Sequence, residues 1–273
     1  MLESRRSREM AALVTTYGGR PVAAPALREV PLEANPDALA FADALLRGDC
    51  DIVILLTGVG TRALLEVASA KHPREAFVAA LARTNVVARG PKPLAVLREL
   101  NVPVWATVPE PNTWRELLAA IDATGESLDG RRVAVQEYGK ANEELLHGLE
   151  ARGARVTRVP VYRWALPEDV GPLRAAVGGI VRGELDVAIF TTSVQVVHLM
   201  EVAASLGQAD AVRDGLRRMV VASIGPTTTE ELTNQGIAAD LEASHPKMGF
   251  LVREAADRSP ALLRQKRNAE RPA

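Results

Sequence analysis

Short apolar runs alternate along this chain with longer stretches in which apolar positions recur every three or four residues. Residues 52–56 and 187–190 are the clearest runs, and each follows an aspartate and ends at a threonine. Continuous apolar runs of this length are typical of strands buried on both faces. Their alternation with helical patterns predicts a parallel sheet flanked by helices, with right-handed crossovers.

The pattern occurs twice in one ungapped register. The stretch that begins at Asp51 aligns with the stretch that begins at Asp186, an offset of 135 residues. Such a register over so long a stretch indicates an internal duplication. The aligned positions include Thr57 with Thr192, residues 66–68 with 201–203, and the Gly-Pro pairs at 90–91 and 225–226.

Further elements complete the two copies. A threonine followed three residues later by a glutamate, Thr113 and Glu116, predicts a helix start with a capping box. At a shift near 134 residues the opening helix corresponds to a later one, and on this register the first copy lacks its opening strand. The other predicted strands are 20–24, 86–88, 103–107, 132–136, 155–161 and 220–224, and the paired helices are 7–17 and 141–151.

Two segments are predicted to cross between two lobes. Residues 30–36 and 161–169 are strand-like and then end in proline and acidic residues, which interrupt regular structure. The predicted fold is α/β, with two flavodoxin-like parallel-sheet lobes related by duplication and joined by two crossing strands. Residues 1–33 and 163–260 form the first lobe, residues 36–160 form the second, and residues 261–273 are a polar tail that we expect to be frayed.

Composition and charge narrow the functional classes. Hydrophobic residues make up 47% of the 273 residues, as in globular proteins, and the formal net charge is only -1. We therefore expect no general attraction to nucleic acid or to a membrane surface. One cysteine, a charged start and the absence of a long apolar run predict a cytoplasmic protein, which we expect to be a monomer.

Standard catalytic and metal-binding motifs are missing. The four histidines do not have the spacing of metal ligands, and no dinucleotide fingerprint, phosphate-binding loop or nucleophile elbow occurs. Cys50 lies between Asp49 and Asp51, whose charges would raise the pKa of its thiol rather than activate it. No metal or cofactor is therefore predicted from the sequence.

Matched turns at the carboxyl ends of the predicted strands are the strongest candidates for a site, because open parallel sheets bind ligands there. The turns after the two central strands offer hydroxyl groups and backbone N–H groups at helix starts, which suits carboxylate binding. Taken singly, each hydroxyl is better explained as a helix cap, whereas the matched set is better explained as a binding site. The candidate binding residues in this pair of turns are Thr57, Gly58, Val59 and Gly60 in the first copy, and Thr192, Ser193, Val194 and Gln195 in the second.

Three more turns extend the candidate site. In the next pair of turns, glycine lets the backbone approach a ligand and proline stiffens the helix start. The charges of Arg89 and Lys92 would hold acid groups or would simply be solvated, and Tyr138 would contact a ligand or pack. The candidate binding residues here are Arg89, Gly90 and Lys92, then Gln136, Tyr138, Gly139 and Lys140, and lastly Gly225, Thr227 and Thr228.

Tyr162 stands in the second crossing segment, in the order Val161, Tyr162, Arg163 and Trp164. A tyrosine there could face a cleft and donate its phenolic proton. An ordinary packing aromatic is the alternative, and position alone does not decide between the two.

The order of these motifs resembles the uroporphyrinogen-III synthase family. The residues that carry the resemblance are the paired turns, the Val-Tyr at 161–162, the Phe-Thr-Thr-Ser at 190–193, and the Ile-Gly-Pro-Thr-Thr at 224–228 followed by a helix and Gly236. The resemblance spans nearly the whole chain in order, from the first helix to about Val252, although each motif is short.

The resemblance implies two α/β lobes with the linear tetrapyrrole hydroxymethylbilane bound between them. A lyase of this family closes that substrate into a ring, inverts its last (D) pyrrole and releases water, through an azafulvene and a spiro intermediate, without any cofactor. It places the chain in porphyrin, heme and tetrapyrrole biosynthesis. Tyr162 matches the tyrosine proposed to act as the acid, and Thr228 matches a threonine of the cleft.

Two other functions fit the same sequence. A two-lobed chain could bind a tetrapyrrole as a sensor without turning it over. It could also be a general binder of one small anion, which would not need Tyr162.

Overall fold

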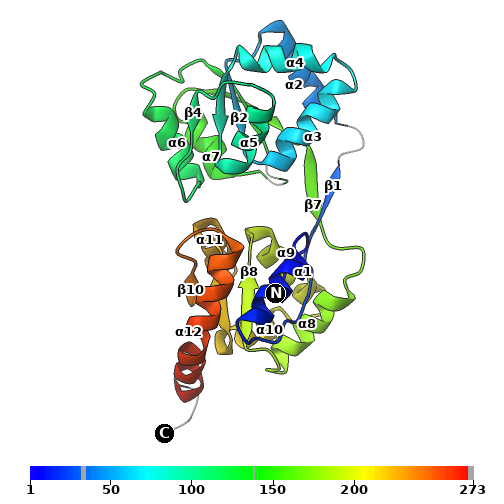
Figure 1. Ribbon diagram of the computed structural model, residues 1–273, viewed down its shortest axis with the longest axis vertical. Helices are drawn as coiled ribbons and strands as arrows, with labels where there is room; N and C mark the ends of the chain where they lie inside the picture. Colours follow the sequence, from blue (N-terminus) through cyan, green and yellow to red (C-terminus); the bar gives the residue numbers. More distant parts are fainter. Residues whose placement is uncertain (32–34, 138, 140, 270–273) are drawn as a thin grey trace. The chain divides into compact units, whose positions relative to one another are not determined.

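The computed structural model describes residues 1–31, 35–137, 139 and 141–269. The chain divides into two compact units: Met1–Arg28 with Ala165–Ala273 (unit 1), and Glu29–Trp164 (unit 2). Both units alternate strands and helices along the chain, as Figure 1 shows. The predicted α/β class with parallel sheets is confirmed.

Unit 2 contains a five-stranded parallel sheet in the order β4-β3-β2-β5-β6. Its strands are β2 (Ile52–Leu55), β3 (Asn85–Ala88), β4 (Ala106–Thr107), β5 (Arg132–Gln136) and β6 (Arg155–Val159). Its helices are α2 (Pro36–Arg47), α3 (Gly58–Ser69), α4 (Arg74–Ala82), α5 (Pro91–Glu99), α6 (Trp114–Asp122) and α7 (Glu143–Glu150).

Both faces of this sheet are covered, which is why β2 is apolar at every position. Ile52 and Ile54 pack with the apolar side chains of α6 and α7, whereas Val53 and Leu55 pack with those of α2, α3, α4 and α5. Successive residues of a strand point to opposite faces, so a strand covered on both sides needs an uninterrupted apolar run. The predicted capping box at the start of α6 is also present, with Thr113 and Glu116 bonded reciprocally.

The order of the sheet reverses between β2 and β5. The chain moves outward from β2 through β3 to β4, and then returns to the other side of β2 to form β5 and β6. In open parallel sheets the crevice at such a reversal, outside the carboxyl ends of the strands, is the usual ligand site. Thr57 follows β2 and Gln136 ends β5, so both lie at this point.

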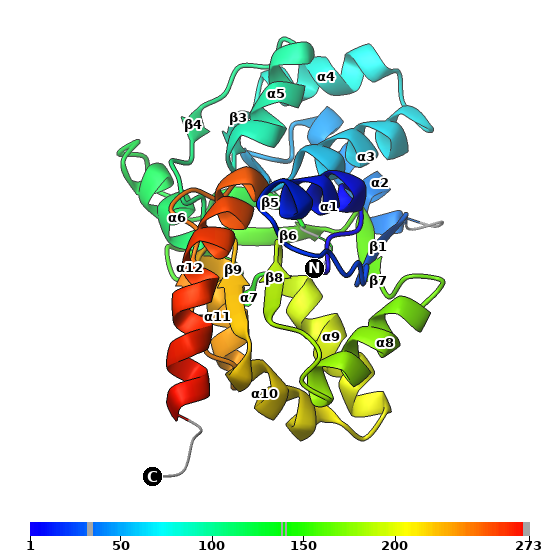
Figure 2. The same cartoon turned by 60° about the horizontal axis from the view of Figure 1, so that its bottom comes forward.

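Unit 1 contains a three-stranded parallel sheet in the order β10-β9-β8. Its strands are β8 (Val187–Phe190), β9 (Val220–Ser223) and β10 (Leu241–Glu242). Helices α8, α9 and α10 pack on one face, and α1 and α12, which lie side by side in Figure 2, pack on the other. The helices of unit 1 are α1 (Ser7–Thr16), α8 (Gly171–Val181), α9 (Ser193–Ser205), α10 (Ala209–Arg218), α11 (Pro226–Asn234) and α12 (Met248–Ala269).

The strand predicted at 20–24 is wrong, because residues 20–27 contain no strand. The backbone there bonds instead to the first two residues of the chain. The amino group of Met1 donates to the Val22 carbonyl (3.1 Å), while the Ala24 and Ala26 amides donate to the carbonyls of Met1 and Leu2 (3.0 and 3.3 Å). These bonds hold the start of the chain against residues 22–26, and Leu2 there is 5% exposed.

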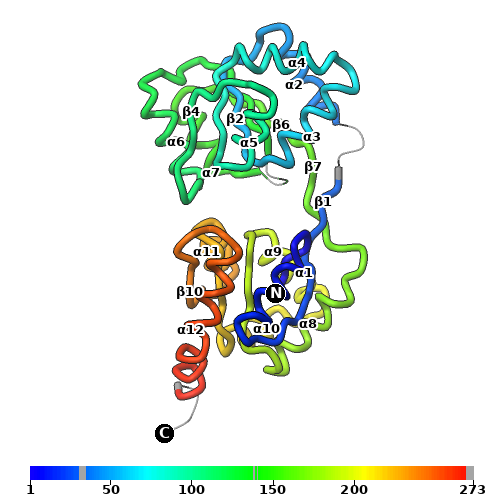
Figure 3. Tube along the Cα trace, in the orientation of Figure 1, coloured from blue at the N-terminus to red at the C-terminus, as the bar shows by residue number. Residues whose placement is uncertain are grey.

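Two short strands connect the units. β1 (Arg28–Pro31) and β7 (Tyr162–Ala165) form a two-stranded sheet. The chain passes from unit 1 to unit 2 through β1 and returns through β7, which can be followed along the trace in Figure 3. The predicted pair of crossing strands is thus confirmed, although the first begins before the predicted segment.

The end of the chain differs from the expected frayed tail. Helix α12 continues through Pro260 to Ala269, and Leu262 and Leu263 pack against the core of unit 1. Lys266 anchors its last turn, because its ammonium donates to the Met219 carbonyl (2.6 Å) and to Asp240 (2.7 Å). Across the described residues, none of the helices has the length and apolar character needed to span a bilayer.

Replacing Lys266 by Met should lower the free energy of unfolding by about 1–2 kcal/mol, because two charge-assisted hydrogen bonds in a partly buried place are lost. Urea unfolding followed by circular dichroism measures the change. Arg267→Met is the matched control, since the ion pair of Arg267 with Asp186 has both side chains more than 60% exposed, and it should cost at most about 0.5 kcal/mol. Equal losses in the two variants would contradict this role for Lys266.

Candidate functional site

The turn after β2 is the centre of the candidate site in unit 2. Thr57 is the N-cap of α3, and its hydroxyl accepts a hydrogen bond from the Gly60 amide (2.9 Å). The predicted turn at 57–60 is therefore mostly helix start, because α3 begins at Gly58. Val59 is 38% exposed, whereas Gly58 and Gly60 are buried.

Gln136 fixes this turn from the neighbouring strand. Its side chain is 1% exposed, its amide oxygen accepts from the Thr57 amide (3.2 Å), and its amide nitrogen donates to the Glu137 carbonyl. A Cβ at Gly60 would lie 2.1 Å from the Gln136 amide nitrogen, so only glycine fits there without displacement. The structure thus brings the predicted residue Gln136 against Thr57 and Gly60, although it lies 79 residues from Thr57 in sequence.

Tyr162 meets the same turn. Its hydroxyl lies 3.3 Å from the Thr57 hydroxyl, and either atom could be the donor. Its ring is 4% exposed and belongs to the apolar cluster that covers one face of the unit 2 sheet. The ring also packs edge-on against Trp164, with 5.3 Å between the centroids. The phenol is therefore held in one place by packing and by a polar contact.

The turn after β5 lies against these two aromatic rings. Gly139 has a positive φ of 65°, and a Cβ there would come within 2.8 Å of both the Trp164 ring and the Tyr162 ring. Glycine is therefore required for both conformation and space. Tyr138 and Lys140, predicted as binding residues in the same turn, lie outside the described residues.

The turn after β3 touches the turn after β2. A Cβ at Gly58 would come within 2.9 Å of the Lys92 carbonyl oxygen, so these two backbones are in close contact. Gly90 has a φ of 82° and faces Asn112, whose carbonyl accepts a hydrogen bond from the Arg89 guanidinium (2.6 Å). The Arg89 side chain is thus partly engaged in a hydrogen bond within the protein, whereas Lys92 is exposed.

The corresponding turn of unit 1 uses a glutamine of its own helix. The Gln195 amide oxygen accepts from the Thr191 amide (2.7 Å), and its nitrogen donates to the Thr191 hydroxyl (2.8 Å). That hydroxyl in turn donates to Glu3 (2.5 Å). Val194 and Gln195 are 5% and 1% exposed, whereas Thr192 and Ser193 are half-buried at the start of α9.

The last predicted turn precedes α11, which starts at Pro226. Thr227 is exposed, whereas Thr228 is 2% exposed and points into the unit. Ser223, which the sequence analysis missed, is fully buried and donates to the Gly225 carbonyl (3.0 Å) while accepting from Thr229 (2.9 Å). A serine at the end of an apolar run was the signal that could have found it.

The family assignment follows from comparison of the whole chain. The model of the family described as uroporphyrinogen-III synthase HemD matches residues 8–253, which include both repeats and every predicted turn. The chain belongs to the uroporphyrinogen-III synthase family. The resemblance proposed from the order of the turns is therefore confirmed.

Individual relatives of this uroporphyrinogen-III synthase family member agree in length and fold. A Methanothermobacter thermautotrophicus protein named "Putative uroporphyrinogen-III synthase" is 31% identical, over 86% of this chain and 87% of its own. A Bacillus subtilis protein named "Uncharacterized protein YjjA" is 29% identical, over 93% and 92%. A crystal structure of uroporphyrinogen III synthase from Thermus thermophilus superposes with a TM-score of 0.73, at 27% identity over 96% of this chain and 97% of that one.

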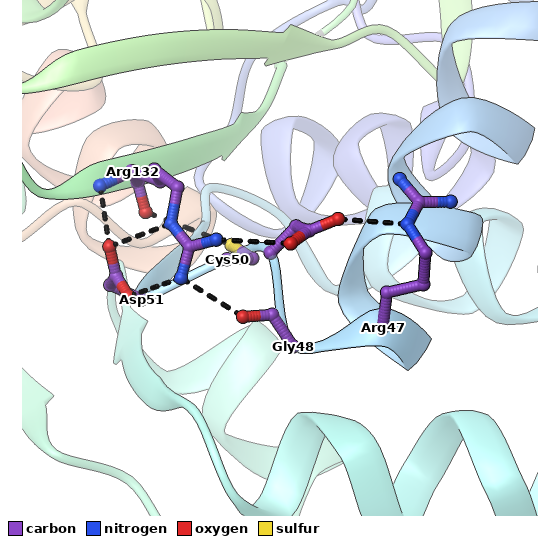
Figure 4. Close-up of polar contacts among 6 residues, drawn as sticks. Arg47, Gly48, Cys50, Asp51 and Arg132 are labelled. Carbon is purple, nitrogen blue, oxygen red and sulfur yellow. Dashed lines mark hydrogen bonds and ion pairs between the residues drawn. The ribbon is translucent and has the colours of Figure 1, made fainter.

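The opposite ends of β2 and β5 carry charges that pair with one another. Arg132, at the start of β5, donates to Asp51 through its backbone amide (2.8 Å) and through the Nε and one terminal nitrogen of its guanidinium (3.1 and 2.8 Å), as Figure 4 shows. It also bonds Asp49 (3.3 Å) and the Gly48 carbonyl (2.9 Å). These bonds fix the start of β2 to the start of β5 in this uroporphyrinogen-III synthase family member.

The charged cluster also decides the chemistry of Cys50. Burial is the largest cause that raises the pKa of its thiol to about 11, and the nearby Asp51 adds to the increase. The sequence predicted this direction of the pKa shift, but from the neighbouring carboxylates rather than from burial, which is the larger cause. The thiol is therefore protonated at neutral pH and is a poor nucleophile.

The bond between Arg132 and Asp51 should make stability depend on acid. Hydrogen bonding from Arg132 lowers the pKa of Asp51 from 3.8 to about 2. Asp51 therefore stabilises the fold above pH 4, and this contribution is lost as the pH falls towards 2. Arg132→Met should be less stable than the wild type at pH 6, and the gap should narrow between pH 4 and pH 2 in thermal unfolding.

Asp51→Asn serves as the matched variant, because it keeps the size of the side chain but cannot ionise. Its stability gap to the wild type should narrow over the same pH range. A gap that stays constant from pH 6 to pH 2 in both variants would show that the ion pair does not couple protonation to folding.

Proposed function

We propose that this chain is a uroporphyrinogen-III synthase that cyclises hydroxymethylbilane, inverts the terminal pyrrole ring and releases water. The observation that carries the proposal is the 3.3 Å contact between the Tyr162 and Thr57 hydroxyls, at the reversal point of a parallel sheet, in a chain whose family match spans both repeats. The names of the Methanothermobacter relative and of the Thermus structure support the same activity.

Tyr162 is proposed as the acid that starts the reaction. Its phenol gives a proton to the hydroxyl of the hydroxymethyl group, which leaves as water while the pyrrole nitrogen supplies the electron pair. The resulting azafulvenium carbon is attacked by the substituted carbon of the terminal pyrrole, which forms the spiro intermediate. The bond from the spiro carbon to its original methylene then breaks, which leaves an azafulvenium on the neighbouring pyrrole. The unsubstituted α-carbon of the terminal pyrrole attacks this methylene, so that the ring is inverted. That carbon then loses its proton, which restores the aromatic ring and the phenol, so that one water is lost overall.

The remaining turns are proposed to hold the carboxylates of the substrate. Backbone N–H groups at the starts of α3 and α5 and the exposed Lys92 are suited to acetate and propionate groups. The substrate is reactive enough to cyclise unaided to the uninverted isomer, so the main task of the protein is to impose geometry. A rigid set of strand ends is suited to that task.

Product analysis tests the proposal directly. The purified chain is supplied with freshly generated hydroxymethylbilane, and the products are oxidised and separated by chromatography. Mainly type III product is expected. Only type I product at the spontaneous rate would mean that the chain binds a tetrapyrrole or another anion without turnover.

Tyr162→Phe should lower kcat about tenfold or more, since positioned acids typically contribute at least that much. Its melting temperature should change little, because the ring that packs in the cluster is kept. Stopped assays of type III product measure kcat, and wild-type turnover in this variant would remove the acid role.

Lys92→Ala should raise KM several-fold and leave kcat nearly unchanged, as expected when a charge binds the ground state and the transition state equally. Lys71→Ala is the control, because Lys71 is also exposed but pairs with Asp43 (2.7 Å) near the far end of α3. Steady-state assays of both variants decide the matter. If the two KM values match, the charge of Lys92 is simply solvated.

A further inference from the structure

The N-terminus of α3 contains half of a capping box. In a complete box the N-cap side chain accepts from the backbone of the third helical residue (N3), and a Glu or Gln at N3 accepts from the N-cap amide. Helix α6 of the same unit has the complete form, with Thr113 and Glu116. In α3 the Thr57 hydroxyl accepts from the Gly60 amide, but residue N3 is glycine and has no side chain to return the bond.

Gln136 provides the missing half from β5. Its amide oxygen occupies the position of an N3 acceptor, 3.2 Å from the Thr57 amide, although it is 79 residues away in sequence. The clash that a Cβ at Gly60 would make, 2.1 Å from the Gln136 amide nitrogen, shows that the two positions compete for one volume. Gly60 and Gln136 therefore form a matched pair.

The other repeat shows the alternative arrangement. Gln195 stands at the position that aligns with Gly60, and its buried amide bonds Thr191 in the turn after β8. Each repeat thus keeps one buried amide against this turn, but unit 1 takes it from the helix and unit 2 takes it from the neighbouring strand.

Thr57 links this arrangement to the proposed chemistry, because it contacts both the turn and Tyr162. Its hydroxyl bonds the Gly60 amide and lies 3.3 Å from the Tyr162 hydroxyl, so any movement of the turn moves the partner of the phenol. Both polar atoms of the Gln136 amide are engaged within the chain, at Thr57 and at the Glu137 carbonyl. Its side chain is 1% exposed.

We propose that Gln136 is a positioning residue that orients Tyr162 through Thr57, because it completes the capping box of α3. Glycine is required at position 60 because a side chain there would occupy the space of the Gln136 amide. The inference rests on the proposed function of Tyr162. It replaces the direct substrate contact that the sequence suggested for Gln136. Gln136 acts without touching the substrate.

A double-mutant cycle tests the link to chemistry. Gln136→Leu and Thr57→Val should each lower kcat about tenfold and change KM less than about twofold. In the Tyr162→Phe background, Gln136→Leu should cause no further loss of kcat, because it acts only through the phenol. If the two losses multiply, Gln136 has a merely structural role and the proposal is overturned.

A transplant of the arrangement in unit 1 tests the matched pair. Gly60→Gln alone should destabilise the chain, because two amides then compete for one space. The double variant Gly60→Gln with Gln136→Leu should regain most of the melting temperature and kcat lost in Gln136→Leu, because the box becomes local, as in α6. If the double variant is no better than the single ones, the two positions are not alternatives.

Amide hydrogen exchange of residues 57–60, measured by mass spectrometry, separates this inference from the proposed function. Gln136→Leu should speed exchange of these amides at least about tenfold, and the double variant should restore protection. If the wild type makes only type I product, the proposed function fails, and exchange alone then decides whether Gln136 orders the turn. Unchanged protection in Gln136→Leu overturns the positioning role whatever the product.

Discussion

The hydrogen bond from the Thr57 amide to Gln136 joins the carboxyl ends of β2 and β5, the two strands between which the sheet order of unit 2 reverses. An N–H group left unsatisfied at a helix start in a partly buried place is costly, typically about 1–3 kcal/mol. Satisfying it from the next strand rather than from the helix links two turns that would otherwise be independent. The Thr57 hydroxyl, the close fit at Gly60 and the place of Tyr162 all depend on this link.

The amino ends of the same strands make a different set of contacts. At the amino ends Arg132 uses both its backbone and its guanidinium on Asp51, and Cys50 beside it is held protonated by burial. The charges there are satisfied by one another, which suits a structural role. At the carboxyl ends the chain places glycines and exposed groups, such as Val59 and Lys92, where backbone can approach a ligand. The same sheet thus has paired charges at the amino ends of β2 and β5, and glycines with exposed groups beyond its carboxyl ends.

Because the chain is duplicated, corresponding contacts occur in both units. Because the two copies have diverged, the elements that make these contacts differ. Asp186 occupies the position in unit 1 that Asp51 has in unit 2, and it also bonds an arginine, but this one comes from the end of α12. Gln195 and Gln136 likewise serve corresponding turns from different elements. After duplication, the buried polar groups in both copies of the sheet still need hydrogen-bond partners, but any nearby element can supply the partner. This choice of partner allows members of a family to keep the fold while individual motifs change.

The sequence by itself determined the class of fold, the duplication and the turns, because apolar runs, glycines and N-cap residues act over a few neighbouring positions. The helix start at Thr113 was predictable because both halves of its box lie within four residues. The carboxyl-end turns at Thr57, Gln136 and Thr192 were found in the same way, and their order led to the family. The strand expected at 20–24 and the frayed tail were errors, since pairing with Met1 and anchoring by Lys266 to Asp240 are set by packing at a distance. Only the tertiary structure brought Thr57, Gln136 and Tyr162 together, because contacts across 79 and 105 residues depend on strand order, which no local pattern encodes.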